Sequence, residues 1–123
     1  MAGKLILVVE DNEKNMKLFR DVLGAIGFTT IAAFSGEEAL ALAAEETPDL
    51  VLMDIQLPDI DGLEALRRLR ADERTAAVPV LALTAQAMRG DRERFLEAGF
   101  DGYVSKPVNV VELIAIVQRH CGG

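Results

Sequence analysis

Short apolar runs alternate with longer amphipathic stretches along the whole chain. The runs are mostly aliphatic, as is typical of strands that are buried on both faces of a sheet. They predict five strands, of which the second is the weakest. The predicted strands are Leu5–Val9, Thr29–Ala33, Leu50–Met53, Val80–Leu83 and Tyr103–Val104.

Between these runs, apolar residues recur at three- and four-residue intervals, which predicts helices that bury one face. The predicted helices cover residues 15–26, 35–46, 62–70, 86–98 and 110–120. Ser35 and Glu38 have the spacing of a capping box, and Asn109 is a suitable cap for the last helix. Gly27 and Gly99 are placed to end two helices, because glycine readily adopts positive φ.

This alternation of strands and helices predicts an α/β fold. The short connections imply right-handed crossovers, and therefore a single doubly wound parallel sheet of five strands with helices on both faces. The 123 residues leave room for one domain of ordinary size. No long linker or low-complexity segment divides them, so we predict one domain over residues 1–123.

Polar side chains follow four of the five strands at the point where each strand ends. The first strand runs into Glu10 and Asp11, the third into Asp54, the fourth into Thr84, and the fifth into Lys106 after one serine. The carboxyl ends of parallel strands share one edge, where open α/β sheets bind ligands. If the strand order is 2-1-3-4-5, Asp54 is central and lies between the two other acids and the pair formed by Thr84 and Lys106.

These groups together suit phosphoryl chemistry. Three neighbouring carboxylates repel one another, and a shared divalent cation relieves that repulsion; hard oxygen ligands favour Mg²⁺. Lys106 supplies positive charge and Thr84 a hydroxyl donor to an anion at Asp54. A central carboxylate that attacks phosphorus becomes an aspartyl phosphate, while the cations neutralise the charge that develops on the phosphoryl oxygens.

Each residue taken alone has a simpler interpretation. Asp11 and Thr84 could cap the helices that follow them, and Asp54 could belong to a turn. Lys106 precedes a proline and could be a solvated loop charge, while Tyr103 is by default a core aromatic residue. The phosphoryl site is therefore predicted from the joint pattern, in which separate strands deliver complementary groups to one edge.

Composition excludes several other classes. The net charge of −7 argues against nucleic-acid binding and against a polybasic membrane anchor. The single Cys121 excludes an internal disulfide, and no apolar run approaches the roughly 20 residues that span a bilayer. We therefore expect a soluble cytoplasmic domain without a secretion signal. The chain also lacks the glycine-rich motifs of nucleotide-binding proteins and the nucleophile motif of α/β-hydrolases.

Four sequence segments are similar to those of response-regulator receiver domains, and the resemblance runs from end to end. The matching segments are Val-Val-Glu-Asp-Asn12, Leu-Met-Asp-Ile-Gln-Leu-Pro58 with Asp61-Gly62 after it, Leu-Thr-Ala85 and Val-Ser-Lys-Pro107. Residues 10–19 resemble more narrowly the stand-alone cell-division regulators of the DivK type, although the receivers of hybrid histidine kinases share much of that stretch. The resemblance implies a flavodoxin-like receiver fold with strand order 2-1-3-4-5.

The resemblance also implies a phosphoacceptor and a metal site. Asp54 would accept a phosphoryl group from the histidine of a sensor kinase or a phosphotransfer protein. Asp11 and Asp54 would bind Mg²⁺ directly, Glu10 would act through water, and the backbone carbonyl of Gln56 would complete the protein ligands. Many relatives have aspartate in place of Glu10, and the longer side chain suits an outer-sphere role.

Three further roles follow from the same resemblance. Lys106 would contact the phosphoryl oxygens, and its peptide bond to Pro107 is expected to be cis. Thr84 and Tyr103 would form a switch that reshapes the surface of the fourth helix, the fifth strand and the fifth helix for a downstream protein. We expect a monomer that binds protein partners and neither nucleic acid nor a membrane.

Three alternatives to a stand-alone switch remain open. The chain could be a receiver from a larger hybrid histidine kinase, with the final Gly122-Gly123 as its boundary. A Mg²⁺-dependent aspartyl-phosphate phosphatase is a second alternative, but such enzymes usually carry an acid two residues after the nucleophile, where this chain has Gln56. The third is a structural flavodoxin-like module without a metal. The leading hypothesis is a non-enzymatic switch with slow self-phosphorylation and dephosphorylation.

Overall fold

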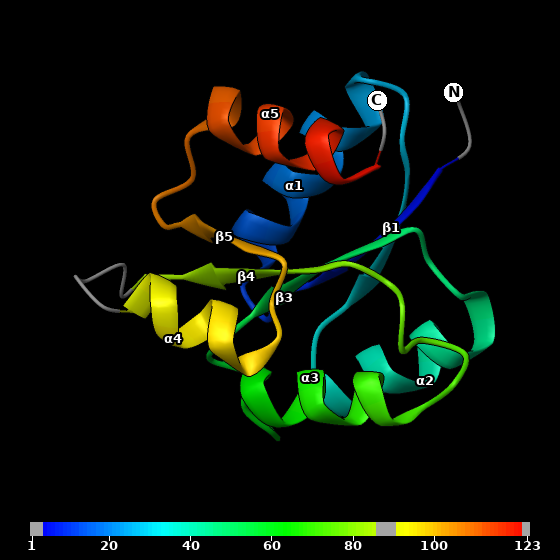
Figure 1. Cartoon of the computed structure of the whole chain (residues 1–123). Coiled ribbons are helices and arrows are strands. Elements are labelled where there is room, and N and C mark those ends of the chain that lie inside the picture. Colours follow the sequence, from blue (N-terminus) through cyan, green and yellow to red (C-terminus); the bar gives the residue numbers. More distant parts are fainter. Residues whose placement is uncertain (1–3, 86–90, 122–123) are drawn as a thin grey trace.

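The computed structural model describes residues 4–85 and 91–121, and its strands form one parallel sheet. The strand order is β2-β1-β3-β4-β5, which confirms the predicted order and places β3 at the centre (Figure 1). The strands are β1 (Leu5–Val9), β2 (Thr29–Ala33), β3 (Leu50–Asp54), β4 (Val80–Thr84) and β5 (Gly102–Ser105).

Helices cover both faces of the sheet. Figure 1 shows α1 and α5 together on one face, and α2, α3 and α4 on the other. This arrangement confirms the predicted doubly wound α/β fold. The helices are α1 (Glu13–Ala25), α2 (Gly36–Glu46), α3 (Gly62–Ala71), α4 (Asp91–Ala98) and α5 (Val110–Cys121).

Two hydrophobic clusters fill the space between the sheet and the two helix layers. In β1, Leu7 and Val9 belong to the cluster beneath α2, α3 and α4, whereas Ile6 and Val8 belong to the cluster beneath α1 and α5. All four side chains are fully buried. A strand covered on both faces needs apolar residues at successive positions, which explains its continuous aliphatic sequence.

The starts of α1 and α2 each differ in one respect from the sequence prediction. The Ser35 hydroxyl accepts a hydrogen bond from the Glu38 amide at 3.2 Å, so the first half of the capping box is formed. The Glu38 carboxylate, however, accepts from the amide of Phe34 at 2.6 Å instead of the amide of Ser35. At α1, Asn12 accepts from the amide of Asn15 at 3.0 Å, and this cap starts the helix two residues before the predicted position.

The turns at the helix ends also match the sequence. Gly27 and Gly99 have φ angles of 100° and 114°, as predicted. Of the helix predicted over residues 86–98, the structure describes the portion that forms α4, and residues 86–90 lie outside the described residues. Across the described part of the chain, none of the helices has both the length and the apolarity needed to cross a membrane.

Candidate functional site at the carboxyl edge of the sheet

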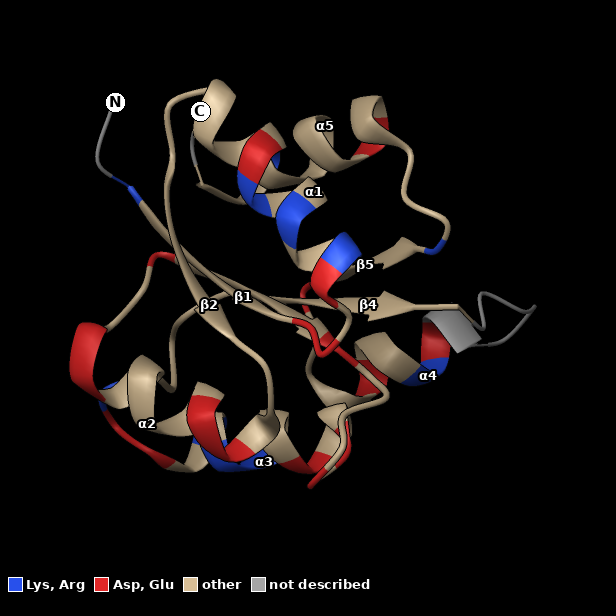
Figure 2. Ribbon diagram, turned by 180° about the vertical axis from the view of Figure 1, so that it is seen from behind, with Lys and Arg blue, Asp and Glu red and all other residues tan. Residues whose placement is uncertain are grey.

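The strand ends bring the predicted site residues to one edge of the sheet. Asp54 is the last residue of β3, and Thr84 is the last residue of β4. Glu10 directly follows β1, and Lys106 directly follows β5. The register aligns these ends, because Asp54 lies opposite Leu83, the residue before Thr84. Figure 2 shows acidic segments gathered between the strand ends and the first turn of α1.

Three acids meet at this edge. Glu10, Asp11 and Asp54 each offer a carboxylate oxygen, and these oxygens all lie within 4.8 Å of one another. Glu10 and Asp54 are 1% and 4% exposed, whereas Asp11 is open to solvent. The cluster is thus buried on one side and accessible on the other, which is the arrangement that a ligand from solution requires.

Lys106 reaches into this acidic cluster. Its ammonium donates a hydrogen bond to Asp54 Oδ2 at 2.7 Å, and its Nζ lies 2.6 Å from Glu10 Oε1. Among the described residues, Glu10 Oε1 has no partner with hydrogen-bond geometry, although the atom is buried. The other Glu10 oxygen accepts from the amide of Asn12 at 3.2 Å. Lys106 therefore pairs with two of the three acids, and its single positive charge does not balance the negative charge of the cluster.

Burial and charge shift the titration of Glu10 and Lys106. The pKa of Glu10 is raised to about 7. Burial is the largest cause; Asp54 also raises the pKa, and Lys106 lowers it. For Lys106, burial lowers the pKa, but hydrogen bonds to Asp54 and Glu10 outweigh that effect, and the net shift is upward. The lysine therefore stays charged at neutral pH, where metal-free Glu10 is half protonated.

The residues present fit Mg²⁺. The donors are carboxylate oxygens of three acids, and the exposed Asp11 leaves a path to solvent. Hard oxygen donors with room for retained water are the environment that Mg²⁺ prefers. Gln56 lies beside these acids, since its backbone amide donates to Asp54 Oδ1 at 2.9 Å. The metal-ligand role of the Gln56 carbonyl stays a prediction.

The two predicted switch residues lie on neighbouring strands. Thr84 is 4% exposed and lies opposite Ser105 in the register of β4 and β5. Tyr103 is half-buried on β5 and packs against the cluster that contains Phe95 and Phe100. The Lys106–Pro107 peptide bond is cis, as expected.

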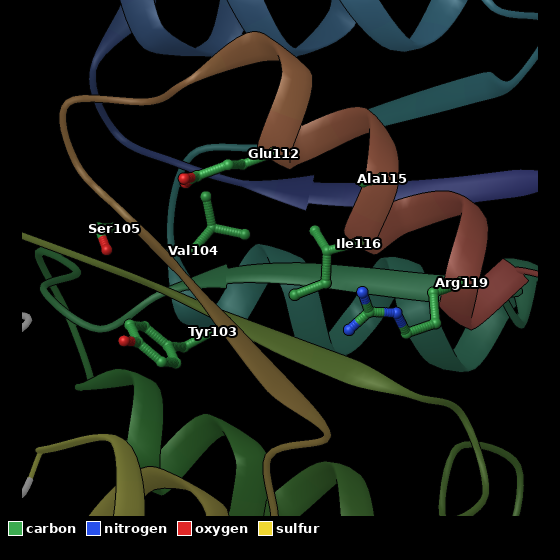
Figure 3. Close-up of a pocket in the computed structure, with 7 residues that line it drawn as sticks. All are labelled: Tyr103, Val104, Ser105, Glu112, Ala115, Ile116 and Arg119. Atoms are coloured by element: carbon green, nitrogen blue, oxygen red, sulfur yellow. The ribbon is translucent and has the colours of Figure 1, made fainter.

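A hollow of about 270 Å³ lies between β5 and α5, and sequence patterns did not indicate it. Figure 3 shows Tyr103 and Ser105 from β5 at this hollow, together with Glu112 and Arg119 from α5. Its charged residues, Glu112 and Arg119, lie on α5 at positions that the sequence does not distinguish from an ordinary solvent-exposed helix face. The hollow therefore becomes visible only when β5 and α5 are placed beside each other.

Known proteins share this fold and sequence over nearly the whole chain. The family described as the response regulator receiver domain matches residues 6–118. The polar-differentiation response regulators DivK of Brucella ovis and Brucella suis are 50% identical over 119 residues, and the match covers 97% of this chain and 97% of each relative.

Solved structures agree with the sequence matches. The receiver domain of a sensor histidine kinase from Pseudomonas aeruginosa PAO1 is 41% identical with a TM-score of 0.90, over 99% of this chain and 100% of that one. That structure has a magnesium ion coordinated in its active-site cleft. The chemotaxis protein CheY4 of Vibrio cholerae is 27% identical with a TM-score of 0.87, over 97% and 98% of the two chains. The chain described here therefore belongs to the response regulator receiver domain family, the phosphorelay receivers of two-component signalling.

Proposed function

We propose that Asp54 is the phosphoacceptor of this receiver, and that a sensor histidine kinase or a histidine phosphotransfer protein supplies the phosphoryl group. The observation that carries the proposal is the pairing of the Asp54 carboxylate with the Lys106 ammonium at 2.7 Å inside a cluster of three acids. An isolated buried ion pair would not need two further acids beside it. A site that receives a phosphoryl group together with a divalent cation needs further acids to bind that cation.

In this proposal, Asp11 and Asp54 hold Mg²⁺ directly, Glu10 acts through water, and the Gln56 carbonyl completes the protein ligands. When bound, Mg²⁺ supplies positive charge that offsets the repulsion between the carboxylates and the phosphoryl oxygens. The fit rests on the oxygen donor set, in which three carboxylates lie within 4.8 Å of one another, and on the exposure of Asp11 to solvent.

The transfer step uses the carboxylate of Asp54 as nucleophile. A carboxylate oxygen forms a bond to phosphorus, the phosphorus–nitrogen bond of phosphohistidine breaks, and the electron pair of that bond stays on the imidazole nitrogen. Lys106 is already within 2.7 Å of the nucleophile, so its ammonium is placed to contact the oxygens of the incoming phosphoryl group. The Gln56 amide, bonded to Asp54 Oδ1, orients the carboxylate before transfer.

The acceptor assignment is tested by incubation with acetyl phosphate and Mg²⁺, followed by intact-mass measurement. The wild-type chain should gain the mass of one phosphoryl group, and Asp54→Asn should gain none, because an amide is not a nucleophile at phosphorus. Asp21→Asn, at an exposed aspartate paired with Lys17 on α1, is the matched control and should behave like the wild type. Uptake by Asp54→Asn would show that the acceptor lies elsewhere.

Phosphorylation is proposed to act as a population shift. A phosphoryl group adds roughly −1.5 to −2 charges at the end of β3, and Thr84 follows Leu83, the residue opposite Asp54 on β4, so we propose that its hydroxyl moves toward the new acceptor. Movement of Thr84 leaves space that the half-buried Tyr103 ring can fill, and this changes the surface formed by α4, β5 and α5. The hollow lined by Tyr103 and Arg119 lies on that surface and suits a downstream protein partner.

Thr84→Ala separates the switch from the chemistry. We expect acetyl-phosphate labelling to stay within about threefold of wild type, since the nucleophile and Lys106 are untouched. Binding of the output partner should lose most of its dependence on phosphorylation, which a pull-down with phosphorylated and unphosphorylated protein would measure. Equal discrimination by the variant and the wild type would remove Thr84 from the switch.

We propose further that the chain is a signalling switch and not a turnover enzyme. Gln56 occupies the place where an aspartyl-phosphate phosphatase would carry its second acid, and its side chain is exposed. Rapid hydrolysis of small phosphate esters would contradict this proposal. The 50% identity to DivK regulators of polar differentiation supports a role in the control of cell division, with proteins as the partners.

A further inference from the structure

The segment that connects β3 to α3, residues 55–61, directly follows the proposed phosphoacceptor and carries the Gln56 peptide. Its two ends are joined, because the Gly62 amide donates to the Ile55 carbonyl at 2.9 Å. Gly62 also lies against the backbone of β3, where an added Cβ would be 2.7 Å from the Asp54 carbonyl oxygen. These contacts fix the two ends of the segment, at Ile55 and Gly62. They do not hold its tip, around Asp59.

The tip is held by Asp59, whose carboxylate binds the start of α2. One oxygen accepts from the Gly36 amide at 2.8 Å, and the other accepts from the Glu37 amide at 2.8 Å. The first amides of a helix have no partner within the helix, and the Ser35 hydroxyl accepts from the amide of Glu38. Asp59 thus caps a helix that lies more than twenty residues away in the sequence.

The electrostatic effect of these hydrogen bonds and the packing beside them agree with a close contact. Hydrogen bonds from the Glu37 amide, and then from the Gly36 amide, hold the pKa of the exposed Asp59 carboxyl below its usual value. A Cβ added to Gly36 would lie 2.3 Å from Ile60 Cγ1, so the segment packs directly on the backbone of α2. Glycine at this position therefore permits an approach that other residues would block.

We propose that Asp59 is a positioning residue for the chemistry at Asp54. By docking the tip of segment 55–61 on α2, it holds the Gln56 peptide against the Asp54 carboxylate. Without this anchor the segment adopts other conformations, and affinity for the metal falls in proportion to the fraction of molecules that are still in the competent arrangement. The inference rests on the proposed function, because it gives Asp59 an effect on Mg²⁺ and phosphoryl transfer.

Asp59→Asn is the deciding variant, because it keeps the size of the side chain but replaces one accepting oxygen with an NH₂ group. The matched control is Asp49→Asn, at an exposed aspartate that accepts from the Leu5 amide at the other end of the sheet. Calorimetry with Mg²⁺ alone should show affinity weakened by about three- to tenfold in Asp59→Asn and unchanged in Asp49→Asn. Asp59→Ala should weaken it at least as much.

Three further measurements separate positioning from a purely structural role. In the metal-free protein, amide hydrogen exchange at Gln56 should be faster in Asp59→Asn than in the wild type. The Mg²⁺ concentration for half-maximal labelling by acetyl phosphate should rise by the factor seen in calorimetry, and labelling at saturating Mg²⁺ should approach the wild-type rate. A lower melting temperature with unchanged Mg²⁺ affinity and unchanged exchange at Gln56 would overturn the proposal.

The same experiment distinguishes two kinds of failure. If wild type is labelled at Asp54 and Asp59→Asn needs no more Mg²⁺ than wild type, the positioning role is wrong and the proposed function stands. If wild type itself neither binds Mg²⁺ nor accepts a phosphoryl group, the proposed function is wrong, and with it the positioning role that rests on it.

Discussion

Glu10 at the sheet edge and Glu64 on α3 both lie beside basic side chains, yet their pKa values shift in opposite directions. Hydrogen bonds from Arg67, and then from Arg68, lower the pKa of Glu64 to about 2. Burial raises the pKa of Glu10 to about 7, although Lys106 lies 2.6 Å away. A neighbouring cation therefore does not decide the outcome by itself.

The difference comes from solvent and from the number of acids that share each cation. Glu64 is a partly exposed acid with two guanidinium groups, and water solvates whatever charge the arginines leave uncompensated. At the sheet edge one ammonium serves Glu10 and Asp54 together, and both carboxylates are buried. The charge of the α3 cluster is compensated by its own arginines, whereas the sheet-edge cluster carries excess negative charge that a proton on Glu10 or a further cation would offset.

Removal of Lys106 should have the largest effect. Lys106→Met keeps much of the side-chain length but withdraws the ammonium that contacts Asp54, so labelling by acetyl phosphate should slow by roughly 10²-fold or more. Arg68→Met, at the α3 cluster, is the matched control and should label at the wild-type rate. The labelling rates of the two variants are measured by intact mass. If they differ by less than a few fold, the sheet-edge cluster and the α3 cluster matter equally for labelling.

Replacement of Glu10 should change how stability depends on pH. Glu10 titrates near 4.5 in the unfolded chain and at about 7 in the folded one, so between these values the folded state binds more protons. The free energy of unfolding of the metal-free protein should therefore fall as pH rises through this window, by up to roughly 3 kcal/mol from this residue. Glu10→Gln should remove that fall.

Urea denaturation in the presence of a chelator, from pH 5 to pH 7.5, measures this effect. Saturating Mg²⁺ should flatten the wild-type curve as well, because a bound cation favours the charged form of neighbouring carboxyls. Parallel curves for wild type and Glu10→Gln would mean that Glu10 is ionised throughout the window.

The smallest effect is expected at Glu64. Glu64→Gln removes ion pairs with Arg67 and Arg68 that are exposed to solvent, and such pairs contribute little to stability. The melting temperature at neutral pH should stay within about 2 °C of wild type, and the difference should disappear in roughly 1 M salt. A large loss that persists in high salt would show that the α3 cluster is as sensitive as the sheet edge.

The sequence predicts the fold well because the central strands are buried on both faces. Leu5–Val9 and Thr29–Ala33 were predicted with the bounds that the structure has, and β3 and β4 each extend one residue further, into Asp54 and Thr84. These polar residues end the apolar runs and so look like the first residues of a loop. In the structure they continue the strand pairing, which aims them along the sheet edge.

The contacts that hold the site together were less predictable. The capping of α2 by Asp59 joins residues from separate segments, and no local spacing in the sequence reports such a contact. The pairing of Glu10 with Lys106 depends on which strands are neighbours and on the reach of both side chains. The periodicity of apolar residues indicates which faces of the helices and strands are buried. Hydrogen bonds and ion pairs between side chains of separate segments can be predicted only when the relative positions of those segments are known.

Because Asp54 and Lys106 are 52 residues apart in the chain, their pairing exists only when β5 has joined the sheet. A polypeptide still emerging from the ribosome, or one whose last strand has separated from the sheet, holds Asp54 without the Lys106 ammonium beside it. Competence to receive the signal is therefore a property of the finished molecule. A copy in which β5 has not joined the sheet therefore lacks the ion pair on which the proposed phosphoryl transfer depends.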